Sequence, residues 1–260
     1  RGFYREDIES LEERVRAVLW SFLSAVQNLT RLPLGHLPFG PASFGRGTAF
    51  FPLVGLLVGC VLIAIYFVGN VLLPQGVVAV LMVIGGLLFT GGMHLDGLID
   101  TVDGLGGMDP GRRLEIMRDS QVGAFGVMGA VSALMLRFVL FQSAVGTAWR
   151  AILLAPVVSR CCLVWAIFLF PYVRSQGQGS LYKAYTGWQE VAAATVFTGC
   201  LCLGIGGIWG FFLATASFPV TFILGRFFCR LFGGLTGDHY GAVNEVTELF
   251  ILAAGLAVFR

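Results

Sequence analysis

Long apolar runs alternate with short polar segments along most of this chain, and the alternation predicts a membrane protein built from helices. Continuous apolar segments cover roughly residues 50–73, 76–95, 122–146 and 148–172. Each is close to the roughly twenty residues that a helix needs to cross a bilayer. Residues 190–232 are too long for one span and fit two, with a turn near 206–210, and a last apolar run follows residue 248. We therefore expect an all-α polytopic membrane protein with about seven transmembrane helices, although six or eight also fit the pattern.

The N-terminal segment has a different pattern. Residues 5–30 begin as an amphipathic helix, because Ile8, Leu11, Val15 and Leu19 recur at helical spacing. Its apolar part is short for a span, so an interfacial helix fits better than a transmembrane one, with a partner-binding or solvated helix as the alternative. Three prolines and four glycines in residues 30–47 predict a loop. Residues 1–30 thus form an amphipathic, interfacial N-terminal helix, and residues 31–260 form a single membrane-embedded domain.

Composition and charge agree with a membrane location. The chain is 57% hydrophobic and only 12% charged, whereas soluble domains carry about 25% charged residues. The net charge of +2 comes without a basic patch, so we expect no nucleic-acid partner. With seven spans, the N-terminal tail and the polar segments 96–121, 173–189 and 233–248 share one side. An excess of arginine marks that side as cytoplasmic, and we expect the cell inner membrane as the location.

An acidic segment follows the second apolar run and carries the strongest chemical signal. Asp96, Asp100 and Asp103 are spaced so that a helix would place all three carboxylates on one face. Such a cluster needs a counter-charge, and hard oxygen ligands favour Mg²⁺, Mn²⁺ or Ca²⁺ over zinc. Three solvated acids at a helix end are the alternative. We expect residues 96–121 to form a loop. His94 comes directly before the acids and is either a proton acceptor or an ordinary hydrogen-bonding histidine.

Arginines follow the acids. Arg112, Arg113 and Arg118 have donors suited to phosphate, although a surface helix of salt bridges with Glu115 is the alternative. Three more arginines lie within or at the ends of predicted spans, where charges usually face the bundle interior: Arg137, Arg150 and Arg160. Of these, Arg160 is the best placed to be functional.

A third polar group comes before the last apolar run. Asp238, Asn244, Glu245 and Glu248 begin a helix if Thr236 or Asp238 caps it. We interpret them as a second metal or ribose-hydroxyl site that faces the first acidic group. The alternative is a set of acids that only favour the helix N-terminus.

Three longer motifs together resemble one family. GGMHLDGLIDTVDG (91–104), RRLEIMRDSQVGAFG (112–126) and GGLTGDHYGAVNEVTEL (233–249) are similar to the cobalamin synthase family, adenosylcobinamide-GDP ribazoletransferase. Shorter matches extend the likeness over most of the chain: LTRLPLG (29–35), FFPLVGLLVG (50–59), VVSR (157–160) and LGRFFCRLFGG (224–234). The N-terminal acidic helix, residues 1–16, is longer than this family leads us to expect.

The resemblance implies a Mg²⁺-dependent integral membrane transferase. It would join adenosylcobinamide-GDP to α-ribazole, or to α-ribazole 5′-phosphate, and release GMP. By this likeness Asp96, Asp100 and Asp103 match the family's acidic motif and would bind the metal. Arg118 and Asp119 match its RDS step, Asp238 matches its TGD step, and Glu245 stands where the family also has an acid. Residues 31–260 would then form one catalytic domain.

The chemistry of such a transfer depends on positioning and charge neutralisation. We expect the 5′-hydroxyl of ribazole to attack the phosphorus joined to cobinamide, without a covalent intermediate, and one acid or His94 to accept the proton. Eight residues are candidates for substrate binding: Arg112, Arg113, Arg118, Asp119, Arg160, Asp238, Asn244 and Glu245. A CDP-alcohol phosphotransferase is a second hypothesis, but LeuIleAspThr follows Asp96-Gly97 in place of its DGxxAR motif. A membrane transporter is a third. The oligomeric state stays open, a homo-oligomer included.

Overall fold

The structure is a computed structural model that describes residues 2–35, 40–144 and 148–259, with side chains described for residue 13 and from residue 15 onward. Within those residues all regular secondary structure is helical, apart from one isolated parallel bridge between Tyr172 and Leu235. The helices are α1 (Gly2–Leu29), α2 (Pro41–Gly47), a 3₁₀ turn (Thr48–Phe50), α3 (Phe51–Leu72), α4 (Gln75–Thr90), α5 (Met93–Gly104), α6 (Pro110–Ile116), α7 (Ala124–Ala144), α8 (Trp149–Leu169), α9 (Gln178–Tyr185), α10 (Trp188–Phe232) and α11 (Gly237–Val258).

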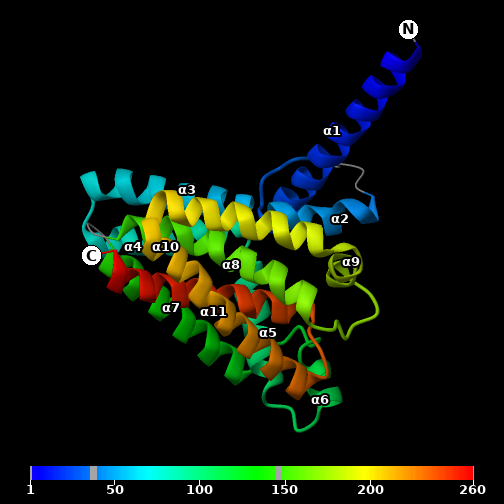
Figure 1. Cartoon of the computed structure of the whole chain (residues 1–260). Coiled ribbons are helices and arrows are strands. Elements are labelled where there is room, and N and C mark those ends of the chain that lie inside the picture. Colours follow the sequence, from blue (N-terminus) through cyan, green and yellow to red (C-terminus); the bar gives the residue numbers. More distant parts are fainter. Residues whose placement is uncertain (1, 36–39, 145–147, 260) are drawn as a thin grey trace.

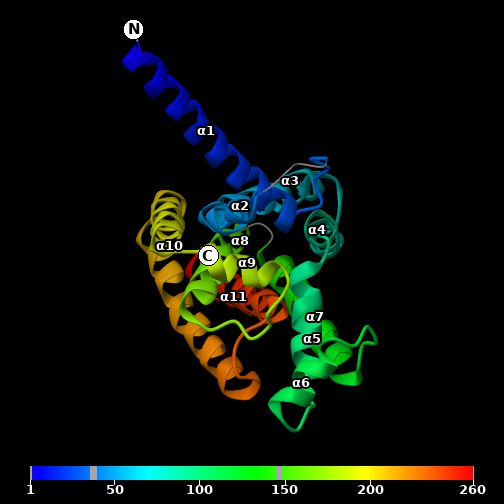
Figure 2. The same cartoon turned by 90° about the vertical axis from the view of Figure 1, so that its right-hand side faces the viewer.

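Helix α8 lies at the centre of the bundle, where α3, α10 and α11 pack against it (Figures 1 and 2). Its apolar side chains are buried all around, as expected for a helix surrounded by others. Helices α7 and α10 instead expose many large apolar side chains to the surroundings, among them Met135, Ile223 and Phe222. A buried centre and an apolar outer surface are what a bundle in lipid requires.

The predicted fold class is confirmed, and the number of spans depends on how the broken helices are counted. Among the described residues, five helices are long and apolar enough to cross a membrane, and the bent pair α4–α5 makes up to six. Helix α10 counts once in that number although it is broken at Gly207, inside the predicted turn at 206–210. In Figure 1 both arms extend from that break toward the same end of the bundle, so the chain reverses its direction there. The seven predicted spans correspond to these six with the arms of α10 counted separately.

The prediction of one continuous run over residues 76–95 was wrong at its end. Helix α4 ends at Thr90, and α5 begins at Met93 after a bend of 91°. Gly91 and Gly92 both have φ near +70°, which only glycine adopts at little cost. The prediction that the acidic segment starts as a loop was wrong too, because residues 96–104 belong to α5. The two glycines thus turn the chain so that the aspartates lie on a helix with a new direction.

Two other predicted loops contain short helices. Residues 41–47 form α2, which starts at Pro41, and proline is favoured at the first position of a helix. Residues 178–185 of the polar segment 173–189 form α9. The segment 233–248 is mostly the first half of α11, as the predicted cap required.

The N-terminal segment is helical, as predicted. Helix α1 projects from the bundle in both views, and its C-terminal end packs against it through Ala25, Val26 and Leu29 (Figures 1 and 2). Val18 and Leu19, nearer the free end, are exposed. The interfacial position of α1 stays a prediction.

The polar segments gather at one end of the bundle. Figure 1 shows α2, α6 and α9 at one end, and the α3–α4 turn, the break in α10 and the C-terminus at the other. This is the shared side that the sequence pattern predicted for segments 96–121, 173–189 and 233–248. Whether that side faces the cytoplasm stays a prediction.

Candidate active site

Helices α5 and α11 cross in close contact at the polar end of the bundle, and two glycines allow the approach. A Cβ on Gly97 would lie 2.6 Å from the carbonyl oxygen of Asp238, and one on Gly241 would lie 3.0 Å from that of His94. Small residues at a helix crossing let two backbones pack directly. The crossing therefore brings the first acidic motif beside the start of α11.

Two aspartates of α5 face the start of α11. Asp100 interacts electrostatically with Asp238, with Asp96 and with the guanidinium of Arg174. Asp96 is exposed, whereas Asp100 and Asp238 are partly buried. Thr236 is the N-cap of α11, as one of the two predicted caps, and its hydroxyl also contacts the Asp238 carboxylate at 3.3 Å. Three acids with a single basic residue between them form a cluster of excess negative charge that is open to solvent at Asp96.

Asp103 also interacts electrostatically with Asp100, but its hydrogen bonds go to α7. Its two carboxylate oxygens accept hydrogen bonds from the backbone N–H groups of Gly126, at 2.7 Å, and Gly123, at 2.8 Å. At the start of α7 such N–H groups have no carbonyl partner within their own helix, and a negative charge is favourable there. Asp103 is only 8% exposed. It thus fixes α7 against α5, and the spacing of three acids in the sequence did not indicate this difference.

Arg174 is the site residue that sequence reasoning missed. Its guanidinium lies 2.9 Å from the Asp238 carboxylate. The chain reaches this position because Val173 and Leu235 pair as neighbouring backbone segments, with Val173 N–H donating to the Leu235 carbonyl at 2.9 Å. Beside it, burial raises the pKa of the Tyr172 phenol, and the charge of Arg174 partly opposes the shift. The one signal in the sequence was a basic residue in a polar segment predicted to share the side of the acids.

The arginines of α6 and of the turn after it have different surroundings from one another. Arg112 pairs with Glu115 on the surface, and both side chains are more than half exposed, which is the salt-bridge alternative. Arg113 donates to the carbonyl oxygens of Gly107 and Leu231 and thereby joins α6 to the end of α10. Arg118, just after α6, is exposed, and its side chain has no hydrogen bond or ion pair within the described part of the chain. It is therefore the arginine of this segment most available to a ligand.

Asp119 is exposed, and its carboxylate accepts a hydrogen bond from the N–H of Gln121 at 3.0 Å. This contact shapes the turn that leads into α7. A role of the exposed carboxylate toward a ligand stays a prediction.

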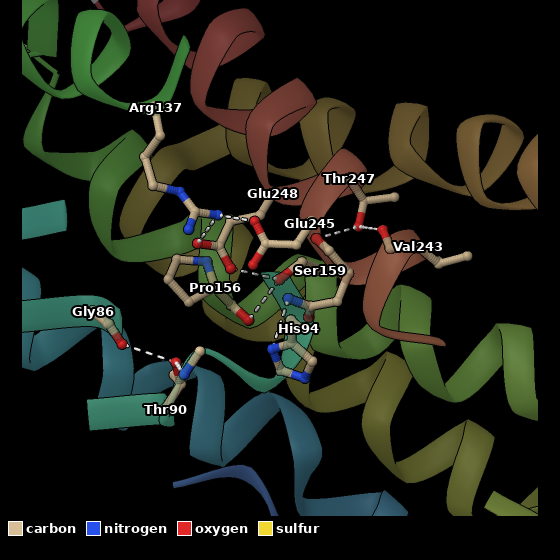
Figure 3. Close-up of polar contacts among 12 residues, drawn as sticks. Gly86, Thr90, His94, Arg137, Pro156, Ser159, Val243, Glu245, Thr247 and Glu248 are labelled. Atoms are coloured by element: carbon tan, nitrogen blue, oxygen red, sulfur yellow. Dashed lines mark hydrogen bonds and ion pairs between the residues drawn. The ribbon is translucent and has the colours of Figure 1, made fainter. Parts of the chain in front are cut away.

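A second charged cluster is buried inside the bundle. Arg137 of α7 pairs with Glu245 at 2.6 Å and with Glu248 at 3.3 Å (Figure 3). Arg160 of α8 also pairs with Glu248. All four side chains are less than 10% exposed. Two positive and two negative charges balance one another, as buried charges require. The hydroxyl of Ser159 also contacts the Glu248 carboxylate, at 3.3 Å.

The buried ion pairs show where several of the predicted site residues lie. Arg137 and Arg160 face the bundle interior, as predicted, whereas Arg150 is exposed and stacks over Trp149. Glu245 lies on the buried side of α11 and Asp238 near its surface, so the two do not form one site.

His94 lies between the two clusters. Its Nδ1 is 3.2 Å from the side-chain amide nitrogen of Asn244, and the ring is 6% exposed. No other hydrogen bond of His94 is found among the described residues, so its Nε2 remains available to a ligand.

A bound metal was predicted on the three aspartates of α5. Within the part of the chain that the structure describes, no three His, Cys, Asp or Glu side chains are arranged to hold a metal by themselves. Asp103 fits poorly, because both of its oxygens are occupied by backbone N–H groups. Asp96 and Asp100 fit better, since Mg²⁺ commonly takes one or two carboxylates and completes its shell with water and substrate phosphates. The metal role of the aspartates stays a prediction.

Comparison with known proteins gives consistent matches. The family model described as cobalamin-5-phosphate synthase matches residues 21–256. A protein of Roseiflexus sp. (strain RS-1) named adenosylcobinamide-GDP ribazoletransferase is 39% identical over 88% of this chain and 86% of its own length. Proteins with the same name from Geotalea daltonii and Vibrio parahaemolyticus are 37% and 32% identical, over 91% and 98% of this chain and 97% and 98% of their own lengths. No solved structure matches.

Proposed function

Since the chain belongs to the cobalamin-5-phosphate synthase family, we propose that this membrane-embedded transferase joins adenosylcobinamide-GDP to an α-ribazole acceptor and releases GMP. The observation that carries the proposal beyond the family is the crossing of α5 and α11. It places Asp96 and Asp100 of the first motif beside Asp238 of the third, with Arg174 between them. The two motifs are more than a hundred residues apart in the sequence, and their meeting supports a single active site.

The chemistry of the acceptor changes which of its hydroxyl groups we expect to attack. The family description names a cobalamin 5-phosphate, a product that keeps a phosphate on the acceptor. An acceptor with a phosphate at its 5′ oxygen has no free hydroxyl there. The 5′-hydroxyl expected from the sequence therefore cannot attack in that case, and we propose that a ring hydroxyl of the ribose attacks. Its oxygen bonds to the phosphorus joined to cobinamide, the bond from that phosphorus to GMP breaks, and the hydroxyl proton leaves to a base.

The charges around Asp100 suit a diphosphate that arrives with a cation. A bare diphosphate would be repelled by Asp96, Asp100 and Asp238. We propose that Asp96 and Asp100 hold Mg²⁺ together with the substrate phosphates, with Asp238 close by. Bound there, the ion would neutralise the phosphates and the leaving GMP. Arg174 and the exposed Arg118 are the guanidinium groups proposed to contact phosphate oxygens.

Two groups are candidates for the base. Asp100 belongs to the acid cluster, and His94 has an unpartnered Nε2 on the same helix. Asn244 fixes the ring through Nδ1, and Nε2 can accept a proton only with the amide oxygen of Asn244, in place of its nitrogen, turned toward Nδ1–H. The location proposed is the cell inner membrane, with the polar end of the bundle toward the cytoplasm, where nucleotides and Mg²⁺ are available.

The test is an assay of the purified protein in detergent. Adenosylcobinamide-GDP is supplied with α-ribazole or with α-ribazole 5′-phosphate, and GMP and the corrinoid product are measured by chromatography. We expect stoichiometric GMP and product with Mg²⁺, and none after removal of divalent ions with EDTA. GMP without a joined product, or turnover of a CDP-alcohol in place of adenosylcobinamide-GDP, would overturn the proposal. Uptake of a solute into proteoliposomes without nucleotide turnover would favour the transporter hypothesis instead.

A further inference from the structure

A cavity of about 210 Å³ lies beside the α5–α11 crossing, on the side away from the buried ion pairs. The end of α1, the starts of α3, α5 and α11, the short helix α9 and the C-terminal part of α8 line it. Met93, His94 and Gly237 belong to its wall; Asp238 directly follows Gly237 in the chain, and Asp96 comes two residues after His94. The cavity is therefore adjacent to the acid cluster.

The walls of the cavity are mainly apolar and aromatic. Phe51, Leu163 and Ile167 form one side and Tyr182 and Tyr240 contribute rings. The Tyr182 ring packs edge-on against Phe51 with centroids 5.4 Å apart, which keeps the wall rigid. Pockets of this kind bind flat, apolar ring systems, and a few polar groups fix their orientation.

Three polar groups on the wall have free hydrogen-bonding capacity, and one of them is the buried hydroxyl of Tyr240. His94 is more than nine-tenths buried, and its Nε2 has no partner among the described residues. The side-chain amide nitrogen of Asn28 donates to Ser24, which leaves the amide oxygen as a free acceptor in the described part of the chain. A buried polar group without a partner costs free energy unless a ligand or water satisfies it.

The volume of the cavity limits which part of the two substrates it can hold. Whole drug-sized ligands fill pockets of about 300–1,000 Å³, so about 210 Å³ is too small for a corrin ring or a complete nucleotide. It suits one bicyclic aromatic base. In the proposed reaction the acceptor carries such a base, a dimethylbenzimidazole, on its ribose.

We propose that this cavity binds the aromatic base of the α-ribazole acceptor. The proposal rests on the proposed function. The aromatic base packs among Phe51, Leu163 and Tyr182, and Nε2 of His94 contacts it. The ribose extends past Gly237 toward Asp238 and Asp100, so that Asp100 is then the group that takes the hydroxyl proton. The end of α1 contributes Asn28, so the N-terminal helix completes the acceptor pocket.

The test fills the cavity and measures each substrate separately. In the Met93→Trp variant the larger ring occupies the space of the base. We expect the KM for α-ribazole to rise tenfold or more, while the KM for adenosylcobinamide-GDP changes less than twofold. A riboside of unsubstituted benzimidazole, which is smaller, should recover part of the lost efficiency. The matched control is Met135→Trp, because Met135 is 64% exposed on α7, and its kinetics should equal those of the unmodified protein.

The outcomes separate this proposal from the proposed function. An unchanged KM for α-ribazole in Met93→Trp overturns the pocket and leaves the transferase intact. So does an equal loss with both acceptors, since the change then acts on the fold and not on the base. If the unmodified protein turns over neither acceptor, the proposed function fails. Equilibrium dialysis with α-ribazole alone then still decides the pocket: binding that Met93→Trp weakens supports it, and no binding overturns it.

Discussion

The three aspartates of α5 should separate into a structural and a catalytic group when each is neutralised. In Asp103→Asn the amide keeps one oxygen but turns an NH₂ group toward one of the two N–H donors, Gly123 or Gly126. One hydrogen bond to a charged group is lost, about 1.5–3 kcal/mol. The negative charge at the start of α7 goes with it, about 0.3–1 kcal/mol.

The total loss of about 2–4 kcal/mol should lower the midpoint of thermal unfolding by roughly 5–15 °C, at about 2–4 °C per kcal/mol for a chain of this size. The midpoint is measured in detergent by intrinsic fluorescence, and GMP release is measured below it. We expect Asp103→Asn to keep part of its turnover at low temperature. Asp100→Asn is the matched control: it should keep the midpoint and lose turnover, because its carboxylate lies in the acid cluster.

The opposite result would refute this reasoning. If Asp103→Asn unfolds at the unmodified midpoint and releases no GMP, its carboxylate serves the substrate or a metal, and the contacts with α7 are secondary. The three aspartates would then act together, as their spacing in the sequence first indicated.

Three further predictions concern the contacts that build the site. Gly97→Ala should separate α5 from α11 and lower GMP release at least tenfold, because a Cβ would lie 2.6 Å from a backbone oxygen of α11. The control is Gly204→Ala on α10, where the added Cβ meets no atom within 4 Å and should have no effect on GMP release. Glu248→Gln should destabilise the fold by about 3–5 kcal/mol, because it leaves the buried charge of Arg160 without its partner, and replacing both by methionine should restore part of the thermal midpoint. Arg174→Gln should lower GMP release about tenfold or more, with Arg174→Lys between it and the unmodified protein.

Each of these has a clear contrary result. Equal activity of the two alanine variants would mean that the α5–α11 crossing does not position the acids. A normal thermal midpoint in Glu248→Gln would show that the buried ion pairs contribute little to stability. Full activity in Arg174→Gln would restrict that arginine to its ion pair with Asp238.

Much of this protein follows from the sequence alone. Apolar runs about twenty residues long require helices in lipid, because a spanning backbone must satisfy its own hydrogen bonds, and that determined the fold class. The turn near Gly207 and the cap at Thr236 were visible as a glycine-rich break and as a capping residue. These features depend on neighbours a few residues away, which the sequence lists directly. The family motifs likewise indicated which acids to examine.

Tertiary structure decided what each charge faces. Asp96, Asp100 and Asp103 look equivalent on a helix, yet the start of α7, 20 residues further on, takes both oxygens of Asp103. Arg137 meets Glu245 across 108 residues, and Arg174 reaches Asp238 only because its segment pairs with Leu235. The role of a carboxylate depends on the donors and charges that folding brings within a few ångströms, and helical spacing says nothing about partners on another helix.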